Sequence, residues 1–154
     1  MSDWKLPWSA SCLCGQVQMR VTQPPLLTVA CHCTGCQKLS SGPYSLTMIV
    51  PAAGFEVSGN EPVIGALHGP HRHHYCTHCK SWLYTVPQGF EDFVNFRPTM
   101  LDDASWVRPF VDVMTSEMLP GVISGAPHAF TGNPDPTQFP RYVELFAKEG
   151  ARPA

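Results

Sequence analysis

The residues best suited to chemistry in this sequence are its seven cysteines, which fall into three short clusters. The clusters are Cys12-Leu13-Cys14, Cys31-His32-Cys33-Thr34-Gly35-Cys36 and Cys76-Thr77-His78-Cys79. Two thiolates separated by one or two residues can both turn toward one ion, and Zn²⁺ takes four such ligands in a tetrahedron. We therefore interpret the cysteines as metal ligands, because cysteines that merely fill a core have no reason to gather in this way.

Seven ligands divide most economically into a group of four and a group of three. Four thiolates close a zinc site, which is typical of a structural metal, whereas three leave one position open, which is typical of a catalytic metal. A rival partition joins two cysteines of the middle cluster with the third cluster and leaves the first cluster as free thiols. The preferred partition predicts two zinc ions per chain and leaves the occupancy of the second open. Its structural and open sites are, respectively, Cys12, Cys14, Cys76 and Cys79, and Cys31, Cys33 and Cys36.

Charge favours a thiol as the fourth ligand of the open site. Zn²⁺ with three thiolates is formally a monoanion, and such a metal acidifies water less than a histidine-rich site does. A further soft ligand, a substrate thiolate, still suits it. His32 lies between two of the three cysteines, so it is a candidate catalytic residue, either as a proton shuttle or as a donor to a ligand sulfur. The alternative is that His32 points away, because successive residues of a strand face opposite sides.

Histidines also gather just before and within the third cluster. They are candidate metal ligands, but the alternation of His71 and His73 with Arg72 and His74 equally fits a strand with polar faces. Lys38 and Arg72 are candidates for holding a carboxylate of a substrate, against the commoner role of solvated surface residues. The clustered histidines are His68, His71, His73, His74 and His78.

The scaffold that must position these residues is predicted to consist of short strands. The 154 residues include 16 prolines and 12 glycines, a composition that disfavours helices and favours turns. Residues 141–149, followed by Gly150, predict a short C-terminal helix, and 121–138 predict a long loop. We expect an all-β, sandwich or barrel-like fold of short antiparallel strands, in a single domain over 1–154 with flexible ends at 1–8 and 150–154. The β-rich runs span 17–21, 27–30, 45–50, 55–57, 62–67, 71–75, 82–86, 93–96 and 110–113.

Net charge and hydropathy exclude some classes of partner. The formal charge of −2 lacks the basic surplus of a nucleic-acid groove or a surface for anionic membranes. The first residues lack the apolar stretch of a signal peptide, and no run reaches the roughly 18 apolar residues of a membrane helix. We therefore expect a cytoplasmic protein without nucleic-acid or membrane partners, in a compartment where thiols stay reduced.

The order of the three clusters resembles the glutathione-dependent formaldehyde-activating (Gfa/CENP-V-type) domain family. The matching motifs are C-x-C-G-x-V at 12–17, C-H-C-x-x-C at 31–36 and an aromatic residue before C-x-x-C at 75–79. The resemblance implies a β-tent fold, with a structural zinc on the outer clusters and a catalytic zinc on the middle one. It also implies a carbon–sulfur lyase similar to S-(hydroxymethyl)glutathione synthase, with glutathione or a similar small thiol as its partner.

The sequence departs from this family at several points. Lys80 follows the last cysteine where the family usually has glycine, at a position that often requires a positive φ, which lysine adopts at a cost. A Gly-Thr-Leu-Asp-like stretch is replaced by residues 99–103, and Met118 and its neighbours stand where relatives tend to carry a tryptophan. A non-catalytic zinc-binding module of β-tent fold that binds other proteins is therefore kept as the alternative to an enzyme. The oligomeric state stays open, a homodimer included.

Overall fold

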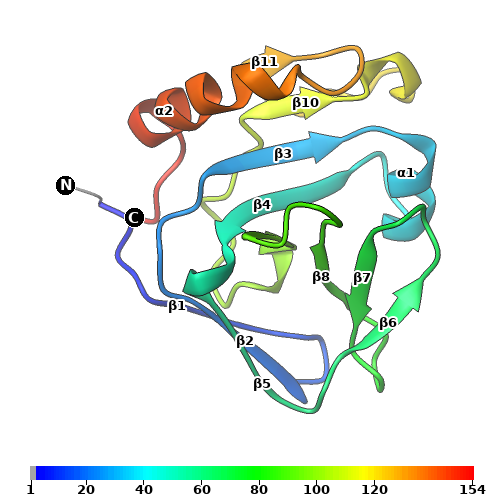
Figure 1. The fold of residues 1–154 in the computed structure, drawn as a ribbon, viewed down its shortest axis with the longest axis vertical. Helices are drawn as coiled ribbons and strands as arrows, with labels where there is room; N and C mark the ends of the chain where they lie inside the picture. The colour runs from blue at the N-terminus through cyan, green and yellow to red at the C-terminus, as the bar shows by residue number, and fades with distance from the viewer. Residues whose placement is uncertain (1–2) are drawn as a thin grey trace.

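The computed structural model describes residues 3–154, and over that range the chain forms two β-sheets and two α-helices joined by turns (Figure 1). The helices are α1 (Thr34–Ser40) and α2 (Phe139–Glu149). The strands are β1 (Trp8–Ser11), β2 (Val17–Val21), β3 (Leu27–Cys31), β4 (Ser45–Pro51), β5 (Phe55–Gly59), β6 (Val63–Ala66), β7 (Arg72–Tyr75), β8 (Trp82–Val86), β9 (Phe93–Phe96), β10 (Val111–Val113) and β11 (His128–Ala129).

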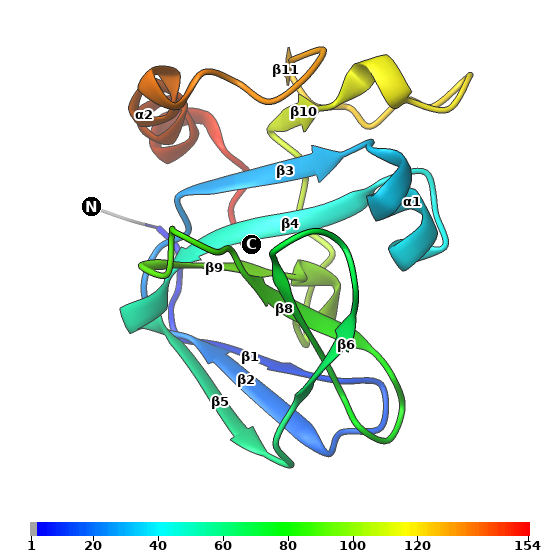
Figure 2. The same ribbon diagram turned by 45° about the vertical axis from the view of Figure 1, so that its right-hand side comes forward.

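The smaller sheet has the order β1-β2-β5, and the larger has the order β11-β10-β3-β4-β9-β8-β7-β6. All pairs are antiparallel except those of β10, which runs parallel to both β3 and β11. Figure 2 shows the small sheet at the end of the molecule opposite α2. This mostly-β architecture with a short C-terminal helix confirms the predicted all-β class and fits a β-tent fold. The two parallel pairs and the additional helix α1 depart from the expected set of antiparallel strands.

The core is built from alternate residues of the strands, as period-2 patterning requires. Val17, Met19 and Val21 of β2 are buried, whereas the two residues between them are exposed. Met48 of β4 and Phe96 of β9 are fully buried at the centre of the larger sheet. The small sheet therefore contributes one apolar face to a core that it shares with the large sheet.

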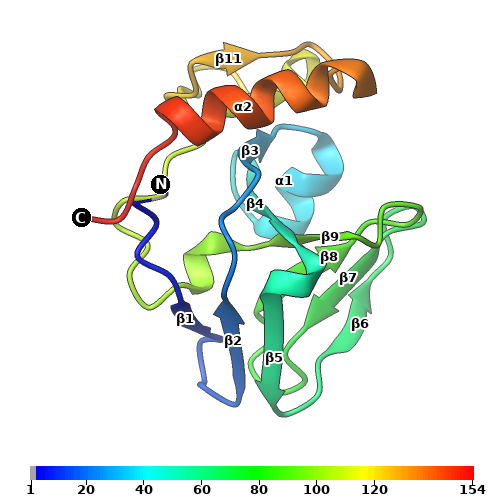
Figure 3. The ribbon, with the colours of Figure 1, turned by 60° about the vertical axis from the view of Figure 1, so that its left-hand side comes forward.

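Helix α2 packs at the β10 and β11 end of the larger sheet (Figure 3). It begins two residues before the predicted start, at Phe139, and ends before Gly150 as expected. Its buried residue Phe146 contacts the rings of Trp4 and Phe110, at centroid distances of 5.6 and 5.4 Å. Neither helix of the described chain has the length and apolarity needed to cross a membrane.

The ends of the described chain pack against each other. Trp4 and Trp8 are buried, and the guanidinium of Arg152 lies over the Trp4 ring, 3.5 Å from its centroid. Residues 1 and 2, which belong to the N-terminal segment expected to be flexible, lie outside the described residues. Flexibility of the two ends and the single-domain organisation stay predictions.

Candidate metal centres

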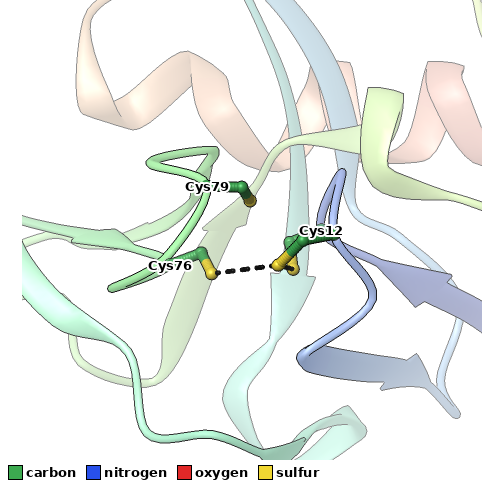
Figure 4. A group of neighbouring side chains, drawn as sticks. Cys12, Cys76 and Cys79 are labelled. Atoms are coloured by element: carbon green, nitrogen blue, oxygen red, sulfur yellow. Dashed lines mark hydrogen bonds between the residues drawn. The ribbon is translucent and has the colours of Figure 1, made fainter.

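The first and third cysteine clusters meet in space, although the turns that carry them belong to different sheets. Cys12 and Cys14 lie in the turn between β1 and β2, and Cys76 and Cys79 lie in the turn between β7 and β8. Their four sulfur atoms lie within 4.8 Å of one another. Figure 4 shows the sulfurs of Cys12, Cys76 and Cys79 turned toward a common point. We call these residues the four-cysteine group.

The spacing of these sulfurs suits a tetrahedral zinc ion. With Zn–S bonds of about 2.3 Å, the sulfurs of a tetrahedral site are about 3.8 Å apart. The Cys12 and Cys14 Sγ atoms are 3.5 Å apart, and those of Cys14 and Cys76 are 3.7 Å apart. Desolvation opposes ionisation of Cys79, yet hydrogen bonds from the hydroxyl and amide of Ser81 lower its pKa to about 5. The donor set therefore fits zinc in chemistry and in separation.

Lys80 completes the turn of the third cluster in the left-handed conformation. Its φ is +62°, and its amide donates to the Cys76 carbonyl oxygen at 3.1 Å. The turn after a C-x-x-C pair thus takes the backbone conformation that glycine adopts most readily, with a lysine in its place. This confirms the expected positive φ at a residue where the sequence departs from the family.

The middle cluster forms a second group, at the junction of β3 and α1. Cys31 ends β3, Cys33 caps the N-terminus of α1, and Cys36 lies in the first turn of the helix. The Cys33 Sγ accepts the Cys36 amide at 3.3 Å, and the three sulfurs lie within 4.8 Å of one another. We call Cys31, Cys33 and Cys36 the three-cysteine group.

The three-cysteine group cannot ionise fully by itself. Interaction with the nearby Cys31 thiol is the main cause that lowers the pKa of Cys36 to about 5, with smaller contributions from Ser45, Cys33 and the positive charge of Arg97 and with burial opposing them. The same interaction, together with burial, raises the pKa of Cys31 well above its usual value. Adjacent thiolates repel one another in this way unless a cation lies among them. Three clustered sulfurs that disfavour one another's ionisation are a donor set that fits a soft divalent metal.

A cavity of about 600 Å³ opens beside this second group. One face of the larger sheet lines it. On β3 and β4 every second residue lines the cavity, since residues two apart on a strand project to the same side. Cys31 ends such a row on β3, and Cys33 and Cys36 also line the cavity, whereas none of the four-cysteine group does. The sheet residues that line it are Leu27, Val29, Cys31, Ser45, Thr47, Ile49, His73, Trp82, Thr85, Asn95, Val111 and Val113.

Arg97, just after β9, is the one lysine or arginine among the described residues that line this cavity, and no sequence motif indicated it. It is 7% exposed, and its guanidinium lies over the Trp82 ring at 3.7 Å from the centroid. It donates to the hydroxyls of Thr47 and Thr85, and no ion pair to a carboxylate is found for it in the described chain. The available signal was an arginine ending an apolar strand in a chain with few charges.

His32 lies away from the cavity. Its side chain is fully buried, and its Nε2 is 2.8 Å from Oδ1 of Asp112 on β10. The second carboxylate oxygen of Asp112 accepts the Ser124 hydroxyl at 2.7 Å. His32 is not among the residues that line the cavity, so the structure favours the alternative in which its ring points away from the open group.

The remaining candidates divide between the cavity and the surface. His68, His71 and His73 line the cavity. His74 instead stacks on Tyr84 at a centroid distance of 4.4 Å. His78, like Lys38 and Arg72, is absent from the cavity lining, and Arg72 lies 3.4 Å from Glu91 in an exposed ion pair. In the part of the chain that the structure describes, the only groups with metal-ligand spacing are the two cysteine groups.

Residues 7–117 match the family model described as glutathione-dependent formaldehyde-activating enzyme. The chain belongs to this family. A crystal structure of a Rhodobacter sphaeroides protein, solved as a structural genomics target, resembles this family member with a TM-score of 0.52 and 13% sequence identity. The likeness covers 79% of this chain and 99% of that one, and at this identity it concerns the fold alone. No curated protein matches the chain.

Proposed function

We propose that this chain is a zinc-dependent carbon–sulfur lyase-like enzyme that acts on the adduct of a small thiol, similar to S-(hydroxymethyl)glutathione synthase. The observation that carries the proposal is the contrast between the two groups. The three-cysteine group opens onto a cavity of about 600 Å³, whereas the four-cysteine group does not. The description of the matching family supports glutathione as the thiol and formaldehyde as the electrophile.

In this proposal the four-cysteine group holds a structural zinc, and the three-cysteine group holds a second zinc with one open position. When bound there, zinc supplies a site that keeps a substrate thiol in its thiolate form at neutral pH. The group has the soft donors and the close spacing that such a metal requires.

The residues of the cavity bind and orient the two reactants. The side chains of Leu27 and Val29 on β3 and of Val111 and Val113 on β10 give the cavity an apolar wall, which excludes water from the reacting sulfur and carbon. The positive charge of Arg97 favours an anionic thiolate beside it. Holding sulfur and carbonyl carbon together supplies the effective concentration on which most of the rate gain rests.

We assign His32 a positioning role in place of direct contact with substrate. Its buried bond to Asp112 joins the segment between Cys31 and Cys33 to β10. A second bond, from the His32 amide to the Val113 carbonyl oxygen at 3.0 Å, holds the same segment. Together they fix where two of the three sulfurs lie.

Metal counting by native mass spectrometry tests the proposal. The unmodified chain is expected to carry two zinc ions, and C33S one, with its fold retained because serine is a good N-cap for α1. Addition of glutathione to the two-zinc protein is then expected to add one Zn–S contact in the X-ray absorption spectrum. The matched variant C79S, in the other group, is expected to keep glutathione binding if it folds.

Two outcomes would contradict the proposal. A single zinc ion in the fully loaded chain would remove the open site. Two zinc ions with no new sulfur contact from glutathione would leave a zinc-binding module without the thiol chemistry, which is the alternative function named from the sequence.

A further inference from the structure

His73 of β7 is a buried histidine on the wall of the cavity. It is 4% exposed, and its Nδ1 lies 2.7 Å from the hydroxyl oxygen of Thr85 on β8. Its other nitrogen, Nε2, is buried and has no hydrogen-bond partner among the described residues. A buried polar atom without a partner costs stability, so a histidine in this position indicates that a bound molecule supplies the missing partner.

The position of the ring proton follows from the contacts of Thr85. Its Oγ1 lies 3.0 Å from Nη2 of Arg97 and 3.3 Å from Nε1 of Trp82. A guanidinium and an indole N–H can only donate, and a hydroxyl oxygen has two lone pairs and one proton. Both lone pairs are thus occupied, so the Thr85 proton is donated to Nδ1 of His73. A neutral ring that accepts at Nδ1 carries its own proton at Nε2.

The surroundings also keep the ring neutral. Burial, followed by the positive charge of Arg97 and by His68, His71 and His74, lowers the pKa of His73 to about 4. The one carboxylate among the residues that line the cavity is that of Glu117. Its Oε1 accepts the amide and the hydroxyl of Thr34 at 3.2 and 3.0 Å, and no hydrogen bond or ion pair joins it to His73 in the described chain. His73 is therefore an N–H donor, and its Nε2 has no lone pair with which to bind a metal ion.

We propose that His73 Nε2–H is a catalytic hydrogen-bond donor to the oxygen of a carbonyl substrate, of the aldehyde class, bound in the cavity. The assignment rests on the proposed function, which places the attacking thiolate at the three-cysteine group. His73 then acts where negative charge develops on oxygen, as donors to oxyanions do.

The step balances without an oxidant or a reductant. The thiol loses its proton to solvent on binding. The sulfur electron pair forms the C–S bond, and the carbonyl π pair moves onto oxygen, where it accepts the hydrogen bond from His73 Nε2–H. The oxygen then takes a proton from water, which gives a hydroxyalkyl thioether, while His73 keeps its proton throughout. Release of the aldehyde is the reverse, in which the same donor holds the alkoxide before the C–S bond breaks.

The tautomer is testable without any measurement of activity. Long-range proton–nitrogen NMR spectra of the zinc-loaded chain, with His73 assigned by comparison with H73Q, are expected to show a neutral Nε2–H ring from pH 7 down to pH 5. In T85V, which removes the hydroxyl, the ring is expected to lose this fixed tautomer. An Nδ1–H tautomer, or a ring protonated at pH 6, would overturn the assignment.

Kinetics with glutathione and formaldehyde test the role of the donor. H73F is expected to lower kcat by about 100-fold or more, which is the loss found when one oxyanion donor is removed. H73Q keeps an amide N–H and is expected to recover part of that loss. H74F, on the same strand but stacked on Tyr84 away from the cavity, is the matched control and is expected to retain kcat.

The two proposals fail in different ways. If glutathione adds its sulfur contact in the X-ray absorption spectrum of both wild type and H73F, but H73F retains wild-type kcat, the donor role is overturned and the thiol chemistry stands. If wild type itself gains no sulfur contact, the proposed function is overturned and the assignment of His73 falls with it.

Discussion

The two cysteine groups use the same donor atom but are assembled in opposite ways. The four-cysteine group joins turns that are remote in sequence, with Cys14 and Cys76 62 residues apart, and it ties the small sheet to the large one. The three-cysteine group is local, spanning the end of β3 and the first turn of α1. A link across a long loop restricts the unfolded chain strongly, whereas a local one restricts it little. The remote group is therefore suited to stability, and the local group is free to leave a ligand position open.

Loss of one ligand from each group should separate these roles most clearly. We expect C76S to lower the free energy of unfolding by about 4 kcal/mol or more, because metal binding at a site that joins two sheets is part of the folding free energy. C36S should lose the second metal ion with a much smaller loss of stability. Urea unfolding combined with metal analysis measures both quantities. Equal destabilisation by the two substitutions would contradict the division of roles.

Removal of charge beside the open group should have the next largest effect. In the proposed function, a substrate thiolate would bring further negative charge to a formally negative site, and the buried Arg97 would offset it. We expect R97M to weaken glutathione binding to the zinc-loaded chain by about tenfold, or about 1.4 kcal/mol. Isothermal titration calorimetry provides the measurement.

The control for that substitution is R72M, which removes the same charge from an exposed ion pair outside the cavity. It should leave glutathione affinity unchanged, because exposed charges are screened by solvent and salt. Equal affinity in wild type and R97M would show that Arg97 serves packing against Trp82 and not the charge of the site.

The sequence was sufficient for the partition of the cysteines and for much of the scaffold, because both rest on short-range pattern. The predicted bounds of β8 and β9 agree with the structure, and so does the grouping of the sulfurs. Helix α1 was missed because its N-cap is Cys33, which is outside the usual set of capping residues, and because it has no buried face.

Long-range pairing accounts for the rest of what was missed. His32 meets Asp112 80 residues away because β10 runs parallel to β3, and no local pattern specifies that pairing. Arg97 was missed for a related reason. Its burial depends on a stack over Trp82 and on hydroxyls from β4 and β8, none of which can be read from the residues beside it.

The smallest effect concerns the backbone conformation that the two groups share. Lys80 follows Cys79 of the four-cysteine group at φ +62°, and Ser41 ends α1, the helix that carries Cys36 of the three-cysteine group, at φ +52°. A non-glycine residue in the left-handed region costs roughly 1–2 kcal/mol. Glycine avoids this cost but loses more conformational freedom on folding, which offsets part of the gain. We therefore expect K80G to raise the free energy of unfolding by about 0.5–1 kcal/mol.

Urea unfolding of K80G at saturating zinc measures this gain, with S41G as the matched variant in the other group. Both should keep two zinc ions per chain, because neither side chain is a ligand. The Lys80 ammonium also donates to the Thr77 carbonyl oxygen, and this bond is lost in K80G. A fall in stability for K80G together with a rise for S41G would therefore mean that the lysine is retained for this bond, which would make the four-cysteine turn depend on its side chain and not only on its backbone.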